Sequence, residues 1–484
     1  MKYTTLILLV LLFASCQKEV KHEKLLAKQA VSTDYCFDLS KVYLCQDKTN
    51  KLCYTMPLDV ENINTANGSF GFGYRSRLSP EFQPSFDIFS WQTFIALNWP
   101  SNATGDPIGG FTDYKQSLRV WEHYADVNSL FKSNPRALKA SANLENSEKP
   151  VRLFYLDSKI PNVFATQQGI KPSGFLQADG YPLIDRNLNF AVFEEKVNLT
   201  EEKFIKKYNL TTKKAISDYY HAHKKTFELP INTATVPGAM EIKASWRILD
   251  ASKGDDLSRY YHQNAEILVS DESSASGKSF TIKCVVGLVG LHIIRKTERF
   301  KDWIWSTFEH VDNVPDNLQQ AQDNMEKQWS FYNPGCLNCE PNIPPAHVKG
   351  DTVNDKIMYR WNDTAPYAAR YAQSVPGEAG TAFGTQVTRT YPVYYCTEQI
   401  NAIWQEELRK QNSVFANYRL IGSQWTKTDS PIRAPDAPHF LGNTTAETYL
   451  QPTASCISCH NFATITYAQD TIKTDFSFIF GNAK

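Results

Sequence analysis

The sequence predicts an α+β fold, and three observations carry that prediction. Segments with the apolar spacing of helices and segments rich in β-branched residues occur along the same chain. The chain has 484 residues, of which 42% are hydrophobic and 21% charged, so it can bury one large core or several smaller ones. No repeat of fixed period is visible. We therefore expect a large mixed helix and strand region at about 61–332 and a C-terminal region at about 333–484.

The N-terminus predicts export and a lipid anchor. Residues 1–15 (MKYTTLILLVLLFAS) are typical of a secretory signal peptide, because a lysine precedes an apolar run that small residues end. The stretch from Phe13 to Cys16 resembles the lipobox of bacterial lipoproteins, which implies cleavage before Cys16 and acylation of its sulfur and new amino terminus. Two or three acyl chains hold a protein durably at a membrane. An ordinary signal peptide with an incidental cysteine is the alternative.

Residues 16–60 are expected to form a lipid-anchored tether followed by a cysteine-rich segment. The absence of aspartate directly after Cys16 favours the outer membrane, on either its periplasmic or its surface face. Cys36, Cys45 and Cys53 lie close together in a stretch too short for a core of its own, which favours a local disulfide.

Two classes of interaction are not expected for the body of the chain. Its 51 basic and 51 acidic residues balance, so no broad electrostatic attraction draws it to nucleic acid. The longest apolar run, 284–294, is shorter than the roughly 20 residues that a membrane-spanning helix needs. We therefore expect contact with the membrane through the lipid anchor alone.

Three segments in the first large region have clear periodicity. Ser85–Trp99 carries apolar side chains at helical spacing and ends before a proline, which predicts an amphipathic helix packed on the core. Phe280–Ile294 is rich in β-branched residues, which predicts a buried strand or hairpin punctuated by Gly287 and Gly290. Ala265–Ser270 is the expected partner strand, across a turn rich in serine.

The secondary structure of two segments in the C-terminal region can also be predicted. Thr397–Lys410 (TEQINAIWQEELRK) predicts a helix, and Tyr418–Thr426 predicts an extended segment. Both precede the motif that carries the most chemistry.

The sharpest chemical signal is the pentapeptide Cys456-Ile457-Ser458-Cys459-His460. CxxCH is the attachment site of c-type haem, in which two thiols add to the haem vinyl groups and the histidine ligates the iron. We therefore expect covalent haem c at Cys456 and Cys459 with His460 as axial ligand, which makes 333–484 the haem-bearing region. The alternatives are a disulfide beside a bystander histidine and part of a zinc site completed by another Cys-x-x-Cys.

The sixth position of the iron is left open by the sequence. Only 24 residues (484 minus 460) follow His460, and they contain neither methionine nor histidine. A sixth ligand therefore comes from upstream, or the position stays open. The upstream candidates are Met358, His439, His347, His310 and His292. The first two share the C-terminal third with the motif, whereas a histidine in a strand, such as His292, is more often a core residue.

The remaining cysteines are expected to pair for the most part in an oxidising compartment. Seven are left once Cys16 and the CxxCH pair are set aside, so at least one is free, binds something or bonds another molecule. They are Cys36, Cys45, Cys53, Cys284, Cys336, Cys339 and Cys396. Cys336 and Cys339 form a second CxxC in a proline-rich turn, with Glu340 in place of the histidine. A small disulfide loop is the favoured interpretation, and a degenerate haem site or a metal clip is the alternative.

A second histidine-bearing stretch, Trp303–Pro315 (WIWSTFEHVDNVP), places Glu309, His310 and Asp312 among aromatic residues. Such a cluster can orient a haem, bind a substrate or shuttle protons. We favour the simpler reading, in which the tryptophans are core and the charged residues bond locally, because no nucleophile or metal spacing accompanies them.

Three segments together resemble a family of bacterial exported proteins described as cytochrome c family proteins. They are SWQTFIALNWP (90–100), WIWSTFEHVDNVP (303–315) and NTTAETYLQPTASCISCHNFA (443–463). The resemblance spans most of the mature chain and implies covalent haem at Cys456 and Cys459, with His460 as axial ligand. The second CxxC departs from the haem motif, which argues against a two-haem protein.

The leading hypothesis is a membrane-anchored monohaem c-type protein that transfers single electrons in the cell envelope, with a redox partner protein or a small-molecule donor or acceptor. The alternative is a haem-dependent oxidoreductase whose open iron position acts on peroxide, oxygen or a small organic substrate, because about 270 residues exceed what haem protection needs. A third hypothesis is a surface-binding lipoprotein without haem, in which both CxxC motifs form disulfides.

Overall fold

The computed structural model describes residues 42–61, 83–113, 117–131, 152–155, 174–336, 339–374, 382–426, 435–437 and 440–484. The predicted signal peptide 1–15, Cys16 and the tether after it, Cys36 and His439 lie outside these residues. All described residues belong to one compact unit.

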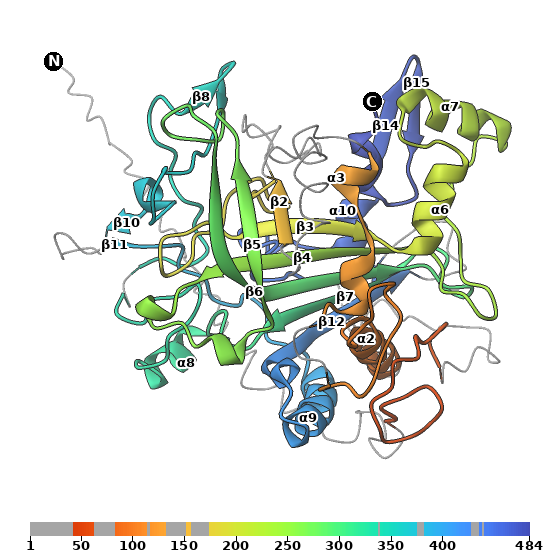
Figure 1. The fold of residues 1–484 in the computed structure, drawn as a ribbon, viewed down its shortest axis with the longest axis horizontal. Helices are drawn as coiled ribbons and strands as arrows, with labels where there is room; N and C mark the ends of the chain where they lie inside the picture. The colour runs from red at the N-terminus through yellow and green to blue at the C-terminus, as the bar shows by residue number, and fades with distance from the viewer. Residues whose placement is uncertain are drawn as a thin grey trace, which may run out of the picture. The chain divides into compact units, whose positions relative to one another are not determined.

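The fold mixes helix and strand in equal parts, 24% each, around a curled sheet, which confirms the mixed helix and strand class. In the described part of the chain nine strands form this main sheet, in the order β1-β3-β4-β6-β7-β12-β13, with β5 on β6 and β2 on β5 (Figure 1). All neighbours are antiparallel except β2 and β5. The bounds are β1 (Ala125–Asp126), β2 (Arg152–Tyr155), β3 (Val192–Val197), β4 (Met240–Leu249), β5 (His262–Val269), β6 (Phe280–Arg295), β7 (Ile304–His310), β12 (Tyr418–Thr426) and β13 (Pro435–Ala437).

Strand β6 organises the sheet and confirms the strand predicted at 280–294. Its first half pairs with β5, the partner expected at 265–270, and its second half pairs with β7, while β4 runs along most of its length. The register between β4 and β6 shifts at Ser245 and Trp246, where Val289 is the extra residue between the two predicted glycines. This bulge increases the local twist of β6, which helps the strand to pair with β5 in its first half and with β7 in its second half.

Helix α2 (Gln83–Leu97) confirms the predicted helix but is not amphipathic, which corrects that part of the prediction. It contacts α9 (Tyr395–Lys410) and β12, and almost all of its residues are buried. Its polar side chains bond inside the protein: the Ser90 hydroxyl lies 2.6 Å from that of Ser306 and 2.7 Å from that of Ser423. The polar face of an amphipathic helix would contact solvent, but here the hydroxyl groups of α2, β7 and β12 bond to one another inside the protein.

The two C-terminal elements predicted from sequence are confirmed. Helix α9 covers the predicted 397–410, and β12 has the predicted bounds. Because β12 pairs with β7, the main sheet includes residues from both sides of the boundary expected near 332.

The other elements are short. They are α3 (Val127–Leu130), α6 (Leu199–Lys207), α7 (Lys213–Ala222), α8 (Leu318–Asp323), α10 (Cys456–His460), β8 (Thr352–Val353), β9 (Lys356–Ile357), β10 (Gln373–Ser374), β11 (Ala382–Phe383), β14 (Thr464–Tyr467), β15 (Asp470–Lys473), and the 3₁₀ helices η4 (Val120–His123), η5 (Ala251–Lys253), η6 (Leu257–Arg259), η7 (Ala369–Tyr371), η8 (Val414–Asn417) and η9 (Phe478–Asn482). The β14–β15 hairpin packs on α7 (Figure 1, upper right).

The cysteines behave largely as expected. Cys45 and Cys53 form the local disulfide, and Cys336 and Cys339 form the small loop of the favoured interpretation. Cys396 is disulfide-bonded too. Among the described cysteines, Cys284, Cys456 and Cys459 have free thiols.

No helix within the described ranges is both long and apolar enough to cross a membrane.

Candidate functional site

The CxxCH pentapeptide forms the short helix α10, and its position is fixed by its neighbours. The Ser455 side chain caps the N-terminus by accepting the Ser458 amide, as serine commonly does there. Ile457 is fully buried in a core cluster shared with α6, α7 and the β14–β15 hairpin. Its amide donates to the Gln424 side chain of β12 at 3.1 Å. The helix is thereby tied to the sheet on one side and to the C-terminal hairpin on the other.

One face of the main sheet lies opposite this helix. The strand register places Glu195 of β3, Lys243 of β4 and His292 of β6 in one row across the sheet. In the next row, Ile294 of β6 stands between Glu241 of β4 and Trp305 of β7. Residues more than 100 positions apart in the sequence thus meet on one surface.

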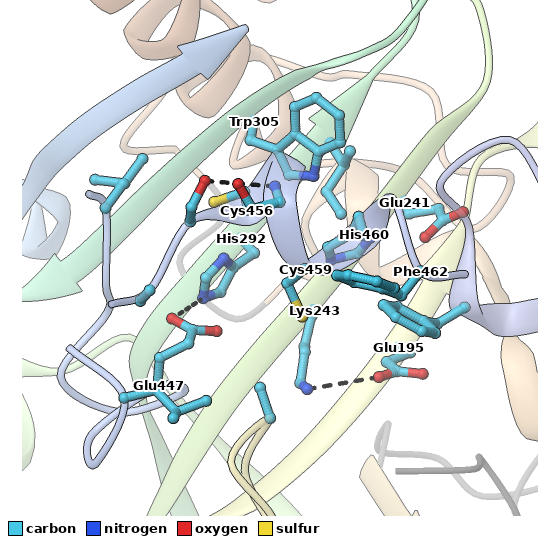
Figure 2. A pocket seen from close by; sticks show the side chains of 18 of the residues that line it. Glu195, Glu241, Lys243, His292, Trp305, Glu447, Cys456, Cys459, His460 and Phe462 are labelled. Carbon is cyan, nitrogen blue, oxygen red and sulfur yellow. Dashed lines mark hydrogen bonds and ion pairs between the residues drawn. The ribbon is translucent and has the colours of Figure 1, made fainter. Parts of the chain in front are cut away.

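A cavity of about 360 Å³ lies between this sheet face and the C-terminal segment, within the range of small-molecule sites. Figure 2 shows Cys456, Cys459 and His460 around the same space as His292 and Lys243. The rest of the lining is mainly apolar and includes Leu441, Leu450, Ala454, Phe462, Phe478 and Ile479. Phe462 is 69% exposed, so the cavity reaches the protein surface beside it.

The His460 ring is held in one tautomer. Its Nδ1 lies 2.7 Å from the carbonyl oxygen of Phe476, which can only accept, so Nδ1 carries the proton and Nε2 keeps its lone pair. Burial lowers the pKa of His460 to about 4, so the ring is neutral at neutral pH. Trp305 and Phe478 pack against the ring edge-on, with centroids 6.0 and 5.1 Å away. A neutral imidazole whose second nitrogen is hydrogen-bonded is the usual form of a metal-binding histidine.

The carbonyl that orients His460 lies on a constrained loop. Asp475 and Phe476 have left-handed backbones, with φ of 53° and 64°, which costs non-glycine residues free energy. Buried bonds hold this conformation: the Asp475 carboxylate pairs with Lys296 and accepts the Leu229 amide at 2.7 Å. Its backbone carbonyl accepts the Trp303 indole N–H at 2.7 Å.

The two thiols of α10 are protonated and unpaired with each other. Burial raises the pKa of Cys459 to about 11 and that of Cys456 well above its ordinary value. The free thiols disagree with the alternative of a disulfide beside a bystander histidine. The second CxxC is itself disulfide-bonded and cannot complete a zinc site with them. Within the described residues, no group of three or more His, Cys, Asp or Glu side chains is arranged to hold a metal ion by itself.

Ionisable groups on the sheet and on the loop that carries Glu447 give the cavity a polar part that sequence reasoning missed. The Lys243 ammonium lies 3.7 Å from the Glu195 carboxylate. Burial raises the pKa of Glu447 to about 7 and that of Glu241 to about 8. These residues are scattered over two strands and a loop, and the only sequence signal is the alternation within each strand, which does not say which face meets the motif.

Of the candidates for a sixth ligand that the structure describes, His292 alone lines the cavity with His460. His292 is 9% exposed, and its Nε2, which makes no hydrogen bond to any residue that the structure describes, lies 3.6 Å from the Glu447 carboxylate. Burial lowers the pKa of His292 to about 3. His347 is exposed, and Met358 is buried beside the β8–β9 hairpin.

One part of the Trp303–Pro315 stretch bonds locally, as the favoured interpretation expects, and another part lines the cavity. His310 stacks on Tyr260 and bonds through Nε2 to the Arg259 carbonyl, and Asp312 pairs with the Arg259 side chain, as the local reading expects. Trp305, by contrast, lines the cavity and contacts His460.

Comparison with known proteins identifies no relative: no family model, no curated protein and no solved structure matches the chain.

Proposed function

We propose that this chain is a monohaem c-type protein, with the haem attached covalently through Cys456 and Cys459 and His460 as axial ligand. The observation that carries the proposal is that all three side chains of the motif face one cavity with mainly apolar walls. Two free thiols, a neutral imidazole with an available lone pair, and apolar walls are what the group requires.

Single-electron transfer is the function this site supports best. Bound haem supplies an iron that cycles between two oxidation states, and the protein tunes its potential through ligand, burial and hydrogen bonding. In this chain the Phe476 carbonyl fixes the His460 ring, and Trp305 and Phe478 shield it. The exposed Phe462 at the mouth of the cavity marks where a redox partner protein or a small-molecule donor or acceptor would approach.

The location in the cell belongs to the same proposal. The signal peptide and lipobox support a lipoprotein anchored through Cys16 in the cell envelope, at the outer membrane. The proposal and the compartment agree, because the thiols of a CxxCH motif receive haem outside the cytoplasm. The resemblance to exported cytochrome c family proteins points the same way.

A second candidate function is a haem-dependent oxidoreductase acting on peroxide, oxygen or a small organic substrate. The polar part of the cavity favours it, because Glu447 and Glu241 have pKa values raised to about 7 and about 8 by burial. Carboxyl groups that hold a proton near neutral pH are suited to general acid–base catalysis.

The proposal is tested by replacing the attachment thiols. The chain is produced in a host with c-type haem assembly machinery, and covalent haem is stained after denaturing electrophoresis. The wild type should stain, and the Cys456→Ser, Cys459→Ser variant should not. The matched control is Cys336→Ser, Cys339→Ser, which removes the other CxxC and should stain like the wild type. A wild-type chain that folds without stain would overturn the proposal.

A further inference from the structure

We infer that His292 is the second axial ligand of the iron, with Glu447 as the group that orients its ring. This inference rests on the proposed haem function and deepens it, because it closes the sixth position. It follows from the placement of His292, from the unmet bonding of its ring, and from the positions of the other described candidates.

The placement of His292 is set by the most constrained strand of the sheet. Strand β6 is hydrogen-bonded to β4 on one side and to β7 on the other, and His292 pairs with Lys243 and Thr307. Its side chain lines the cavity into which α10 presents His460 (Figure 2). The two histidines therefore reach one space from different elements, a strand and a helix, so both side chains would be available to one bound haem.

The bonding of the ring calls for a partner. His292 is 9% exposed, and its Nε2, which lies 3.6 Å from the Glu447 carboxylate, is buried and makes no hydrogen bond among the described residues. Buried polar atoms are rarely left without a partner, and each one needs a physical explanation. The Glu447 carboxylate is the nearby partner for Nε2, and a ring that carries its proton on Nε2 keeps the lone pair of Nδ1 for a metal ion.

Glu447 completes the arrangement. Its carboxylate lies 3.6 Å from His292 Nε2 and accepts the Asn443 backbone amide at 2.9 Å. Ligating histidines usually bond to a carboxylate through the ring nitrogen that does not bind the metal, which fixes the ring and raises its basicity. A ring adjustment of a few tenths of an ångström brings this pair into hydrogen-bond distance.

The approach of the Glu447 loop depends on a glycine two residues before His292. A Cβ atom at Gly290 would lie 2.3 Å from Thr445 Oγ1 and 3.3 Å from Asn443 Oδ1. The absence of a side chain at Gly290 lets the loop from Asn443 to Glu447 lie against β6. The same glycine thus permits the contact between strand and loop on which the His292–Glu447 pair depends.

The other described candidates are committed elsewhere. His310 bonds to the Arg259 carbonyl and stacks on Tyr260, His347 is exposed, and the buried Met358 does not line the cavity. No methionine of the described residues lines the cavity, so a pair of histidines is the ligand set that the cavity offers.

The experiment measures ligation on the haem-loaded full chain. The reduced wild type should not bind carbon monoxide, and His292→Ala should keep its covalent haem, bind carbon monoxide, and regain an inert six-coordinate spectrum on addition of imidazole. His347→Ala, the matched control on an exposed histidine, should behave as the wild type. A wild type that binds carbon monoxide, or a His292→Ala variant that stays inert to it, would overturn the inference while the stained haem leaves the proposed function standing.

A second measurement needs no variant, in case His292→Ala does not fold. The near-infrared magnetic circular dichroism of the oxidised wild type separates two histidine ligands from histidine with methionine or with a carboxylate. A two-histidine band position supports the assignment of His292, and either of the other ligand sets contradicts it. A wild type without covalent haem would contradict both this inference and the proposed function, and the haem stain would show this before the spectra are measured.

Discussion

At the scale of single residues, the site depends on side chains that bond away from the cavity. Asp475 holds a left-handed stretch of backbone through Lys296 and the Leu229 amide, and the next residue, Phe476, offers the carbonyl that fixes His460. Lys296 and Asp475 are both almost fully buried. A buried pair of this kind is costly to break from one side, because the remaining charge keeps its desolvation penalty.

We predict that Lys296→Met lowers the free energy of unfolding by about 3–5 kcal/mol, the usual cost of leaving one buried charge without its partner. The measurement is urea unfolding at neutral pH. The matched control is Lys214→Met, which removes one partner of the exposed Lys214–Asp218 pair on α7 and should change stability little. Equal effects of the two variants would show that the Lys296–Asp475 pair does not hold the loop.

At the scale of elements, β6 carries the most consequences. Its length and β-branched composition made it predictable, as did the alternation in its partner β5. The close approach of the 443–447 loop was not predictable, because Gly290 signals only that some group comes near, without saying which. Helix α2 shows the same limit: the apolar spacing located it, but did not show that its Ser90 bonds to Ser306 and Ser423 of distant strands.

We predict that Gly290→Ala destabilises the protein by about 1–3 kcal/mol, as overpacking of a close contact usually does. The added Cβ would overlap Thr445 Oγ1, which bonds to Asn443 at 2.8 Å and cannot swing away freely. The double variant Gly290→Ala, Thr445→Ala removes the overlapping hydroxyl. In urea unfolding, the double variant should lose less free energy of unfolding than the two single variants lose together. Strictly additive losses would contradict the contact between Gly290 and Thr445.

At the scale of the whole molecule, the motif of the proposed haem site could be found from the sequence, whereas the residues that surround it could not. The CxxCH motif is contiguous in the sequence, so Cys456, Cys459 and His460 could be identified without knowledge of the fold. The opposite wall could not be derived in this way, because Glu195, Lys243, His292 and Trp305 meet only through the register of four strands. Register follows from long-range packing, and a shift of one residue turns every side chain to the other face.

The stability of the whole molecule should depend on pH through buried carboxyl groups, and Asp179 is the clearest to test. Burial raises the pKa of Asp179 to about 7, from 3.8, although the Tyr449 and Tyr181 amides oppose this. The folded chain therefore keeps a proton that the unfolded chain has released between these values. The contribution of this group to stability is present below pH 3.8 and is lost as the pH rises to about 7.

We predict that the wild type loses stability relative to Asp179→Asn as the pH rises from about 5 to about 7, by up to ~1.4 kcal/mol per pH unit. Comparing the two proteins cancels the histidines, whose lowered pKa values act with the opposite sign. Urea unfolding at several pH values measures the difference, which should become constant above about pH 7. A difference that does not vary with pH would contradict the assignment of a raised pKa to Asp179.

The central claim is covalent haem at α10, and mass spectrometry of the matured chain tests it most directly. The protein is matured in a host with c-type haem assembly machinery and digested, and the peptide that contains Cys456 and Cys459 is identified by its mass. We predict that this peptide carries one haem on its two thiols and absorbs in the Soret region. Recovery of the peptide with two unmodified cysteines from well-folded protein would contradict it.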